Sequence, residues 1–210
     1  MSHENWPLER QTDDYCPKHP HRVSYLPYYT GSDYPCNYAG TFKSSTEYNN
    51  YLFYWFFRNQ DASKPLILFV NGGPGASSMQ GLFYENGPFR VINETGDYEI
   101  VDAKKSWLEE ASMIYLDNPA GTGFSIAEQN LSTLDEIRDE FVTFMVAFLS
   151  EYKEYQNNEI YLAGQSFAGK YIPNFATAVL EHNASNPAVK INLKGIMVGN
   201  PIASPIIERT

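Results

Sequence analysis

Apolar residues in this chain fall into short runs that are separated by polar, Gly-rich or Pro-rich segments. Two β-rich runs, YAGTF at residues 38–42 and NNYLFYWFFRN at 49–59, flank the polar KSSTEY and predict an antiparallel hairpin. The continuous apolar runs KPLILFV at 64–70 and SMIYLD at 112–117 are typical of strands buried on both faces. Each of these strands runs into a Gly/Pro loop, NGGPGASS or NPAGTGFS, and we expect the two loops at equivalent strand ends.

The spacing becomes helical over residues 133–155, where acidic residues come first and apolar residues share one face. That face consists of Leu134, Ile137, Phe141, Phe144, Met145 and Phe148. The segments EIYLAG, KYIPNFATAVLEH and INLKGIMVGN then predict a strand, a helix and a strand. This order predicts an α/β fold with a mostly parallel sheet and an N-terminal antiparallel hairpin.

The segment YLAGQSFAGKYIP, residues 161–173, places Ser166 in a G-x-S-x-G pattern between a predicted strand and a predicted helix. In α/β-hydrolases this setting forms a tight turn that exposes a nucleophilic hydroxyl. A side chain at Gly164 or Gly169 would clash with the crossing strand and helix. The N-terminus of the helix would favour negative charge at the site. An ordinary strand-to-helix turn can carry the same pattern, so Ser166 is a candidate nucleophile.

The NGGPGASS loop, residues 71–78, is rich in glycine but lacks the lysine that a phosphate-binding P-loop requires. A Gly-rich loop after a strand of an α/β-hydrolase can instead supply one N–H of an oxyanion hole. The residue that follows the nucleophile supplies the other. On this interpretation the two donors are Gly73 and Phe167.

With 43% hydrophobic and 15% aromatic residues, the chain of 210 residues has enough apolar material for a folded core. Its formal net charge of −10 disfavours nucleic acid and anionic membranes as partners, because both would repel it. The most apolar stretch, YLFYWFF, falls far short of the roughly 20 residues that cross a bilayer, so we expect no membrane span. The N-terminus carries no signal-peptide pattern, and we expect no cofactor and no metal.

Two cysteines and three glycosylation sequons are relevant to whether the protein enters the secretory pathway. Cys16 and Cys36 could form a disulfide, although two cysteines in a chain of this size need not pair. The sequons NET, NLS and NAS would place glycans on exposed loops of a secreted protein, at Asn93, Asn130 and Asn183. Sequons also occur by chance, so these sites only favour the secretory pathway.

Four blocks of the sequence, in this order and spacing, resemble the serine carboxypeptidase family of vacuolar and lysosomal exopeptidases. They are LILFVNGGPGASSMQGLFYENGPF, SMIYLDNPAGTGFS, YLAGQSFAGKYIPNFA and INLKGIMVGNP. The resemblance implies an α/β-hydrolase fold, removal of C-terminal residues at acidic pH, and Ser166 as nucleophile. It also implies that Asn71, the N–H of Gly72 and Glu85 bind the C-terminal carboxylate of the substrate. An amide, a backbone donor and a protonated carboxyl group suit that task.

The sequence departs from the family pattern beside the nucleophile. Gln165 stands where the family usually has Glu, so a pair of carboxyl groups becomes a carboxyl and an amide. Because an amide donates a hydrogen bond at any pH, we expect carboxylate recognition through Gln165 to depend less on acidic conditions. Ala76 replaces a common cysteine, which removes one disulfide of the usual set, and Phe167 replaces the common Tyr.

The sequence offers no complete catalytic triad. An α/β-hydrolase carries Ser, then Asp or Glu, then His, but the 44 residues after Ser166 contain no aspartate and one histidine, His182. A helix would carry His182 about 24 Å from the serine, far beyond the roughly 3 Å of a proton transfer. His3, His19 and His21 lie in the polar opening segment and are poor candidates for a displaced base.

The sequence therefore predicts an N-terminal extension, residues 1–37, and the N-terminal part of an α/β-hydrolase domain, residues 38–210. The chain would be one chain of a two-chain enzyme, a truncated piece, or a shortened natural protein. A sheet that ended here would expose an apolar edge, so we expect a second polypeptide or a missing C-terminal half that supplies Asp and His.

Three functions remain open on the sequence alone. The leading one is a serine carboxypeptidase that acts on the C-termini of peptides or proteins. The alternatives are a catalytically inactive structural or binding protein in a larger assembly, and an acyltransferase or esterase on the same scaffold. The implied location is the vacuole, the lysosome or the extracellular space.

Overall fold

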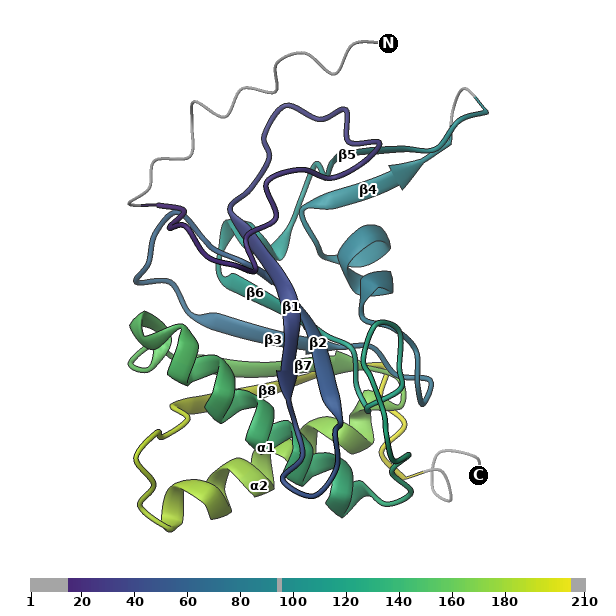
Figure 1. The fold of residues 1–210 in the computed structure, drawn as a ribbon. Coiled ribbons are helices and arrows are strands. Elements are labelled where there is room, and N and C mark those ends of the chain that lie inside the picture. The colour runs from purple at the N-terminus through teal and green to yellow at the C-terminus, as the bar shows by residue number, and fades with distance from the viewer. Residues whose placement is uncertain (1–14, 94–95, 205–210) are drawn as a thin grey trace.

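A six-stranded sheet with the order β1-β2-β6-β3-β7-β8 forms the centre of the computed structural model, which describes residues 15–93 and 96–204 (Figure 1). Strands β3, β6, β7 and β8 run parallel, whereas β1 pairs antiparallel with β2, and β2 with β6. The six strands are β1 (Asn37–Lys43), β2 (Tyr51–Phe57), β3 (Leu66–Val70), β6 (Ser112–Leu116), β7 (Ile160–Gln165) and β8 (Leu193–Gly199). The predicted α/β class and the N-terminal hairpin are confirmed.

Two helices, α1 (Leu134–Glu151) and α2 (Ala168–Ala184), lie side by side on one face of this sheet (Figure 1). Helix α1 begins at a capping box, in which the Thr133 hydroxyl accepts from the backbone N–H of Glu136 and the Glu136 carboxylate accepts from that of Thr133. The single helix predicted over 133–155 is two elements in the structure. The helix α1 ends at Glu151, and a 3₁₀ turn, η4 (Lys153–Tyr155), follows it.

The opposite face carries shorter elements that the apolar pattern does not predict. They are a π-helical turn, η2 (Gly81–Glu85), a 3₁₀ turn, η3 (Trp107–Glu109), and a small antiparallel sheet of β4 (Phe89–Ile92) and β5 (Glu99–Asp102). The N-terminal strap, which we define as residues 16–36, crosses the same region, and Tyr29 pairs with β5 at Ile100. Apolar side chains of the central sheet, such as Phe57 and Phe69, are buried against these elements.

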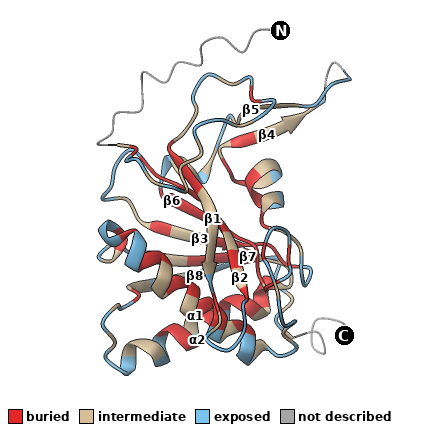
Figure 2. Ribbon diagram, in the orientation of Figure 1, coloured by how far each residue is buried: buried red, intermediate tan, exposed pale blue. Residues whose placement is uncertain are grey.

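Burial is deepest in the middle of the sheet and lowest at its last strand (Figure 2). All five residues of β6 are buried, as expected for a parallel strand covered on both faces. In β8, by contrast, Ile196, Met197 and Val198 are 44%, 37% and 41% exposed. The sheet therefore ends in an apolar strand that α2 covers only in part.

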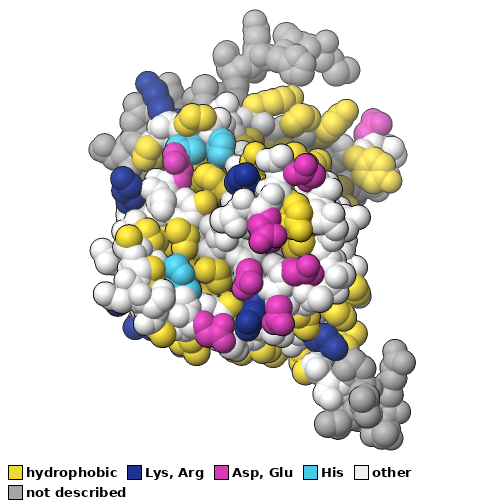
Figure 3. Space-filling view, turned by 60° about the horizontal axis from the view of Figure 1, so that its bottom comes forward, with side chains coloured by type: hydrophobic (Ala, Val, Ile, Leu, Met, Phe, Trp, Pro, Cys, Tyr) yellow, Lys and Arg dark blue, Asp and Glu magenta, His cyan; other side chains and the backbone are white. Residues whose placement is uncertain are grey.

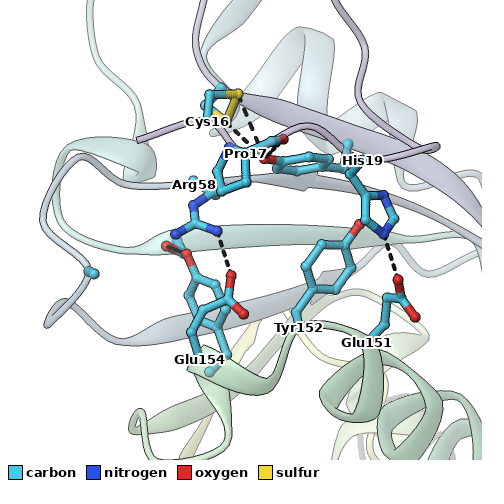
Figure 4. A network of polar contacts seen from close by, with 12 residues as sticks. Cys16, Pro17, His19, Arg58, Glu151, Tyr152 and Glu154 are labelled. Carbon is cyan, nitrogen blue, oxygen red and sulfur yellow. Dashed lines mark hydrogen bonds and ion pairs between the residues drawn. A yellow bond between two sulfur atoms is a disulfide. The ribbon is translucent and has the colours of Figure 1, made fainter. Parts of the chain in front are cut away.

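A disulfide joins the two ends of the N-terminal strap, and a polar contact joins the strap to the end of α1. Cys16 and Cys36 form a disulfide, which answers the question that the sequence left open. A His19 ring nitrogen lies 2.7 Å from the Glu151 carboxylate at the end of α1 (Figure 4). Burial, followed by the neighbouring His19, lowers the pKa of His21 in the same segment.

Candidate active site

Ser166 lies in a sharp turn between the end of β7 at Gln165 and the start of α2 at Ala168. Its φ angle is 57°, a left-handed conformation that costs free energy for a residue with a side chain. A non-glycine residue is kept in such a conformation only where the surroundings fix it. The turn thus has the shape of the nucleophile elbow that the G-x-S-x-G pattern predicts.

The two glycines of the pattern are required by close packing. A methyl group on Gly164 would lie 2.6 Å from Cβ of Ala168 on α2 and 2.8 Å from the carbonyl oxygen of Val70 on β3. A methyl group on Gly169 would lie 2.5 Å from Cβ of Pro201, in the segment that follows β8. Any side chain at either position would therefore push α2 away from the sheet or from the segment after β8.

The Gly-rich loop after β3 reaches the elbow directly. A methyl group on Gly72 would lie 2.5 Å from the backbone nitrogen of Phe167 and 2.9 Å from Cβ of Ser166. Gly73 follows with a φ of 107°, which glycine adopts without strain. The structure therefore brings the loop that carries one predicted oxyanion donor, Gly73, against the turn that carries the other, Phe167.

A buried carboxylate that the sequence did not single out joins this loop to the loop after β6. Asp117 accepts hydrogen bonds from Ser77 Oγ at 2.7 Å, the Ser78 N–H at 2.8 Å and the Phe124 N–H at 2.9 Å. Burial raises the pKa of the Asp117 carboxyl, and these three hydrogen bonds oppose the rise. The sequence feature that could have identified Asp117 is its position, directly after a buried strand and before a Gly/Pro loop.

The predicted carboxylate-binding residues also come together. The Gln165 amide donates to Glu85 Oε1 at 2.6 Å, and the Asn71 amide donates to the same oxygen at 3.4 Å. Asn71 is 2% exposed, and its Oδ1 accepts from the backbone N–H of Gly81 at 2.9 Å, which fixes its orientation. Three residues from the ends of β3, η2 and β7 thus form one polar cluster next to Ser166.

No histidine among residues 15–93 and 96–204 contacts Ser166, and His3 lies outside the described residues. His182 lies near the end of α2, as predicted, and donates from Nε2 to the carbonyl oxygen of Val189 at 2.9 Å. The ring nitrogens of the other two lie 2.7 Å from their partners, His19 from Glu151 and His21 from the Tyr54 hydroxyl. No histidine in the described part of the chain is therefore placed to act as a general base for Ser166.

The three sequons differ in their surroundings. Asn93 and Asn130 are exposed. Asn183 is half-buried, and its amide donates to the Ile191 carbonyl at 2.8 Å and accepts from the Ile191 N–H at 3.0 Å. Asn183 therefore joins the end of α2 to the segment before β8, a role that the sequon alone does not reveal.

The described residues hold no metal cluster and no membrane-spanning helix, and a cavity that they form lies away from Ser166. Within 15–93 and 96–204, His, Cys, Asp and Glu form no group of three that could hold a metal ion. No helix of this part of the chain has the length and apolarity needed to cross a membrane. A cavity of about 480 Å³ lies between the strap and the residues after β2, and its walls include Tyr34, Arg58 and Asp102. None of the predicted site residues lines it.

Similar proteins share the elements that form this site. A KEX1-type protein of Candida tropicalis, described as a pheromone-processing carboxypeptidase, is 40% identical over 177 residues. A protein of Dictyostelium discoideum described as "Probable serine carboxypeptidase CPVL" is 37% identical over 178 residues. These matches cover 81% and 82% of this chain but only 25% and 35% of the two relatives.

A solved structure has the same fold. The structure of KEX1ΔP, a prohormone-processing carboxypeptidase from Saccharomyces cerevisiae, superposes with a TM-score of 0.72 at 33% identity. The match covers 80% of this chain and 39% of that one. Residues 30–210, which include the elbow, the Gly-rich loop and the polar cluster, also match the profile described as serine carboxypeptidase. The chain therefore belongs to the serine carboxypeptidase family.

Proposed function

We propose that this chain is the nucleophile-bearing part of a serine carboxypeptidase that hydrolyses the C-terminal peptide bond of peptides and proteins. The observation that carries the proposal is the elbow itself, where Ser166 has a φ of 57° and the backbone of Gly72 touches Phe167. In this reaction Ser166 Oγ attacks the C-terminal peptide carbonyl and loses its proton to a base, which returns it to the amine of the departing C-terminal residue. Water then cleaves the acyl–serine ester and restores the hydroxyl of Ser166.

The surrounding residues have separate tasks in this proposal. The backbone N–H groups of Gly73 and Phe167 stabilise the oxyanion: Phe167 directly follows Ser166, and Gly73 directly follows Gly72, which packs against the elbow. The side chains of Asn71, Glu85 and Gln165, with the N–H of Gly72, hold the free carboxylate of the substrate. A site that must recognise a chain end needs such donors close to the nucleophile.

The Asp and His of the triad come from outside this sequence, in a second polypeptide or in a further part of a longer chain. Every histidine of the described residues is engaged elsewhere, which supports this assignment. The disulfide between Cys16 and Cys36 fits an oxidising compartment. We therefore place the protein in the secretory pathway, in a vacuole or lysosome or outside the cell.

A fluorophosphonate probe tests the nucleophile, because it reacts with an activated serine. The protein is purified from its natural source with whatever polypeptide accompanies it, and a Ser166→Ala variant serves as control. We expect the probe on Ser166 and no labelling of the variant. An intact protein that never labels would instead support a catalytically inactive binding or structural protein.

Peptide substrates test the exopeptidase assignment. We expect hydrolysis of a peptide with a free C-terminus, and a loss of at least about a hundredfold in kcat/KM when an N-methylamide blocks it, because the carboxylate contacts are lost. Equal cleavage of the blocked peptide would overturn the exopeptidase assignment. Acyl transfer to an added alcohol in place of hydrolysis would favour the acyltransferase alternative.

A further inference from the structure

Asp117 directly follows β6 and is completely buried. Within residues 15–93 and 96–204, no lysine, arginine or histidine forms an ion pair with its carboxylate. Other acidic side chains gather on the face that carries α1 and α2, where solvent reaches them and Arg138 lies among them (Figure 3). Burying a carboxylate without a cation costs free energy that an apolar residue would not cost. The cost indicates that this position needs a hydrogen-bond acceptor.

The two carboxylate oxygens of Asp117 join two different loops. Oδ1 accepts from Ser77 Oγ and from the Ser78 N–H in the Gly-rich loop after β3, and Oδ2 accepts from the Phe124 N–H in the loop after β6. The backbone of Asp117 is itself fixed, because its N–H donates to the Phe53 carbonyl on β2 at 3.0 Å. Asp117 therefore links the Gly-rich loop to a fixed point of the central sheet.

The two ends of the Gly-rich loop are held by different groups. At the near end, the Asn71 N–H donates to Ser78 Oγ at 3.0 Å, and Asn71 Oδ1 accepts from the Gly81 N–H at 2.9 Å. The Ser78 hydroxyl also donates to the backbone of β6 at 2.5 Å. Asn71 is thus fixed by partners other than the Asp117 carboxylate, whereas the far end of the loop at Ser77 is held by that carboxylate.

The backbone between these ends consists largely of glycine. Gly73 and Gly75 have φ angles of 107° and 83°, which glycine adopts without strain. Such a backbone has little stiffness of its own, so its two ends decide where it lies. An oxyanion donor is effective only when it lies about 2.7–3.1 Å from the oxyanion, and even small displacements slow a reaction. The position of the Gly73 N–H therefore depends on how firmly the far end of the loop is held.

We propose that Asp117 is a positioning residue, which holds the far end of the Gly-rich loop through Ser77 and Ser78 and thereby places the Gly73 N–H where the oxyanion forms. The inference rests on the proposed function, since that function makes Gly73 a donor. Asp117 acts through the loop and not on the substrate. Because Asn71 keeps its own partners, loss of the Asp117 contacts slows the reaction more than it weakens binding of the substrate carboxylate.

The Ser77 hydroxyl tests this role by a comparison of kcat with KM. Ser77→Ala removes one hydrogen bond to Asp117, and Ser77→Thr keeps it. Each variant is expressed in the natural source of the protein and purified with whatever polypeptide accompanies it. We expect kcat for a free peptide to fall about tenfold in Ser77→Ala, with KM within about twofold, and to recover in Ser77→Thr.

Ser44→Ala is the matched control for the Ser77 variants. The Ser44 hydroxyl likewise donates to a buried carboxylate, that of Glu140, at 3.1 Å, but it joins the β1–β2 hairpin to α1. We expect no change in kcat. Equal kcat in Ser77→Ala and Ser44→Ala would overturn the proposal. A kcat in Ser77→Thr as low as in Ser77→Ala, or a change in KM alone, would also overturn it.

Asp117→Asn tests the carboxylate itself. An asparagine has one acceptor oxygen, so its NH₂ group faces an N–H donor of one of the two loops. We expect kcat to fall about a hundredfold, with KM changed by less than about threefold. Glu140→Gln is the control, and equal kcat in these two variants would overturn the role of Asp117. If Asp117→Asn loses amide protection throughout α1, it has not folded, and the Ser77 variants decide the question.

Amide hydrogen exchange tests the position of the loop without substrate. The Ala76 N–H donates to the Gly72 carbonyl at 3.1 Å inside the loop. We expect the Ala76 amide to exchange about tenfold faster in Ser77→Ala than in the natural protein, with α1 amides unchanged. Unchanged exchange at Ala76 would overturn the proposal. If the natural protein hydrolyses no peptide, the proposed function fails, while faster exchange at Ala76 still supports Asp117 as the residue that holds the loop.

Discussion

Ser166 and Gly72 show how single backbone positions shape this site. Ser166 accepts a left-handed φ of 57°, and Gly72 approaches the elbow so closely that no side chain fits between them. Strain at one residue and the missing side chain at the other bring the loop after β3 against the elbow, where we propose that two backbone donors stabilise an oxyanion. Substitutions at these positions should therefore affect reactivity more than they affect the free energy of unfolding.

Gly72→Ala tests this expectation. The new methyl group would lie 2.5 Å from the Phe167 nitrogen and 2.7 Å from the Gln165 carbonyl oxygen, so the loop must move away from the elbow. We expect the rate of fluorophosphonate labelling in the active assembly to fall by about 10² to 10³, the usual effect of losing one oxyanion donor. Gly199→Ala is the matched control, because its methyl group meets nothing closer than 3.8 Å. Equal rates in the two variants would contradict the role of Gly72.

Gln165→Glu tests the amide in the polar cluster. The Gln165 amide lies 2.6 Å from Glu85, and two carboxyl groups at such a distance must share a proton. We expect KM for a free peptide to rise more steeply with pH in the variant than in the natural protein, because the variant's pair of carboxyl groups loses its shared proton as the pH rises. The same pH dependence in both proteins would show that Gln165 does not set it.

Asn183→Gln separates a structural role from a glycosylation role. Its side chain makes two hydrogen bonds with the backbone of Ile191, which a longer side chain cannot reproduce. We expect the free energy of unfolding to fall by about 1–3 kcal/mol, against less than about 0.5 kcal/mol for Asn130→Gln at an exposed sequon. Denaturant unfolding measures the difference, and mass spectrometry of the glycosylated protein should find sugar on Asn130 and none on Asn183.

At the scale of elements, the sequence predicts the long and strongly patterned segments. The helix α1 and the buried strands β3 and β6 follow from the spacing of apolar residues. The four-residue strands β4 and β5 do not follow from that spacing. They pair with each other, and β5 pairs with the distant N-terminal strap, so no local sequence pattern indicates them. Short strands of this kind depend on tertiary contacts.

The candidate site likewise contains residues that the sequence predicts and residues that only the structure identifies. Ser166 follows from a local pattern and Gly73 from the Gly-rich loop after a strand, whereas Asn71, Gly72 and Glu85 follow only from the resemblance to a family. Asp117 was missed because its three donors lie on two loops that are far apart in the sequence. The proximity of Gln165 to Glu85 likewise depends on the sheet order, which places β3 next to β7.

A buried carboxyl group joins the β1–β2 hairpin to α1. Glu140 on α1 is 5% exposed and accepts hydrogen bonds from Asn50 Nδ2 at 2.7 Å and Ser44 Oγ at 3.1 Å. Burial raises the pKa of the Glu140 carboxyl above its usual 4.5, although both hydrogen bonds oppose this shift. The folded state therefore binds this proton more tightly than the unfolded state does.

Glu140→Gln removes that titration. The stabilisation that comes from the raised pKa is fully present below about pH 4.5 and is lost as the pH rises through the folded pKa. We expect the natural protein to lose free energy of unfolding, relative to Glu140→Gln, as the pH rises from 4 to 7. Urea unfolding at several pH values measures this. A difference between the two proteins that stays constant across the range would contradict the raised pKa.

At the scale of the whole molecule, the two edges of the described sheet differ. The strap pairs with β1 at one edge, through Arg22 and Tyr38, whereas β8 at the other edge carries exposed apolar residues. Ser166, the proposed nucleophile, lies where β7 and β8 end together. We therefore expect the reactivity of Ser166 to depend on the β8 edge of the sheet.

The disulfide of the strap has a consequence for the cleavage of this protein by proteases. Tyr25 and Tyr28 are 59% and 75% exposed and lie between Cys16 and Cys36, so the strap offers accessible cleavage sites. A cut there releases nothing, because the disulfide still tethers both new ends. Nicked and intact molecules would migrate together on a non-reducing gel and separate only after reduction. The strap can thus be cleaved without the loss of any part of the protein.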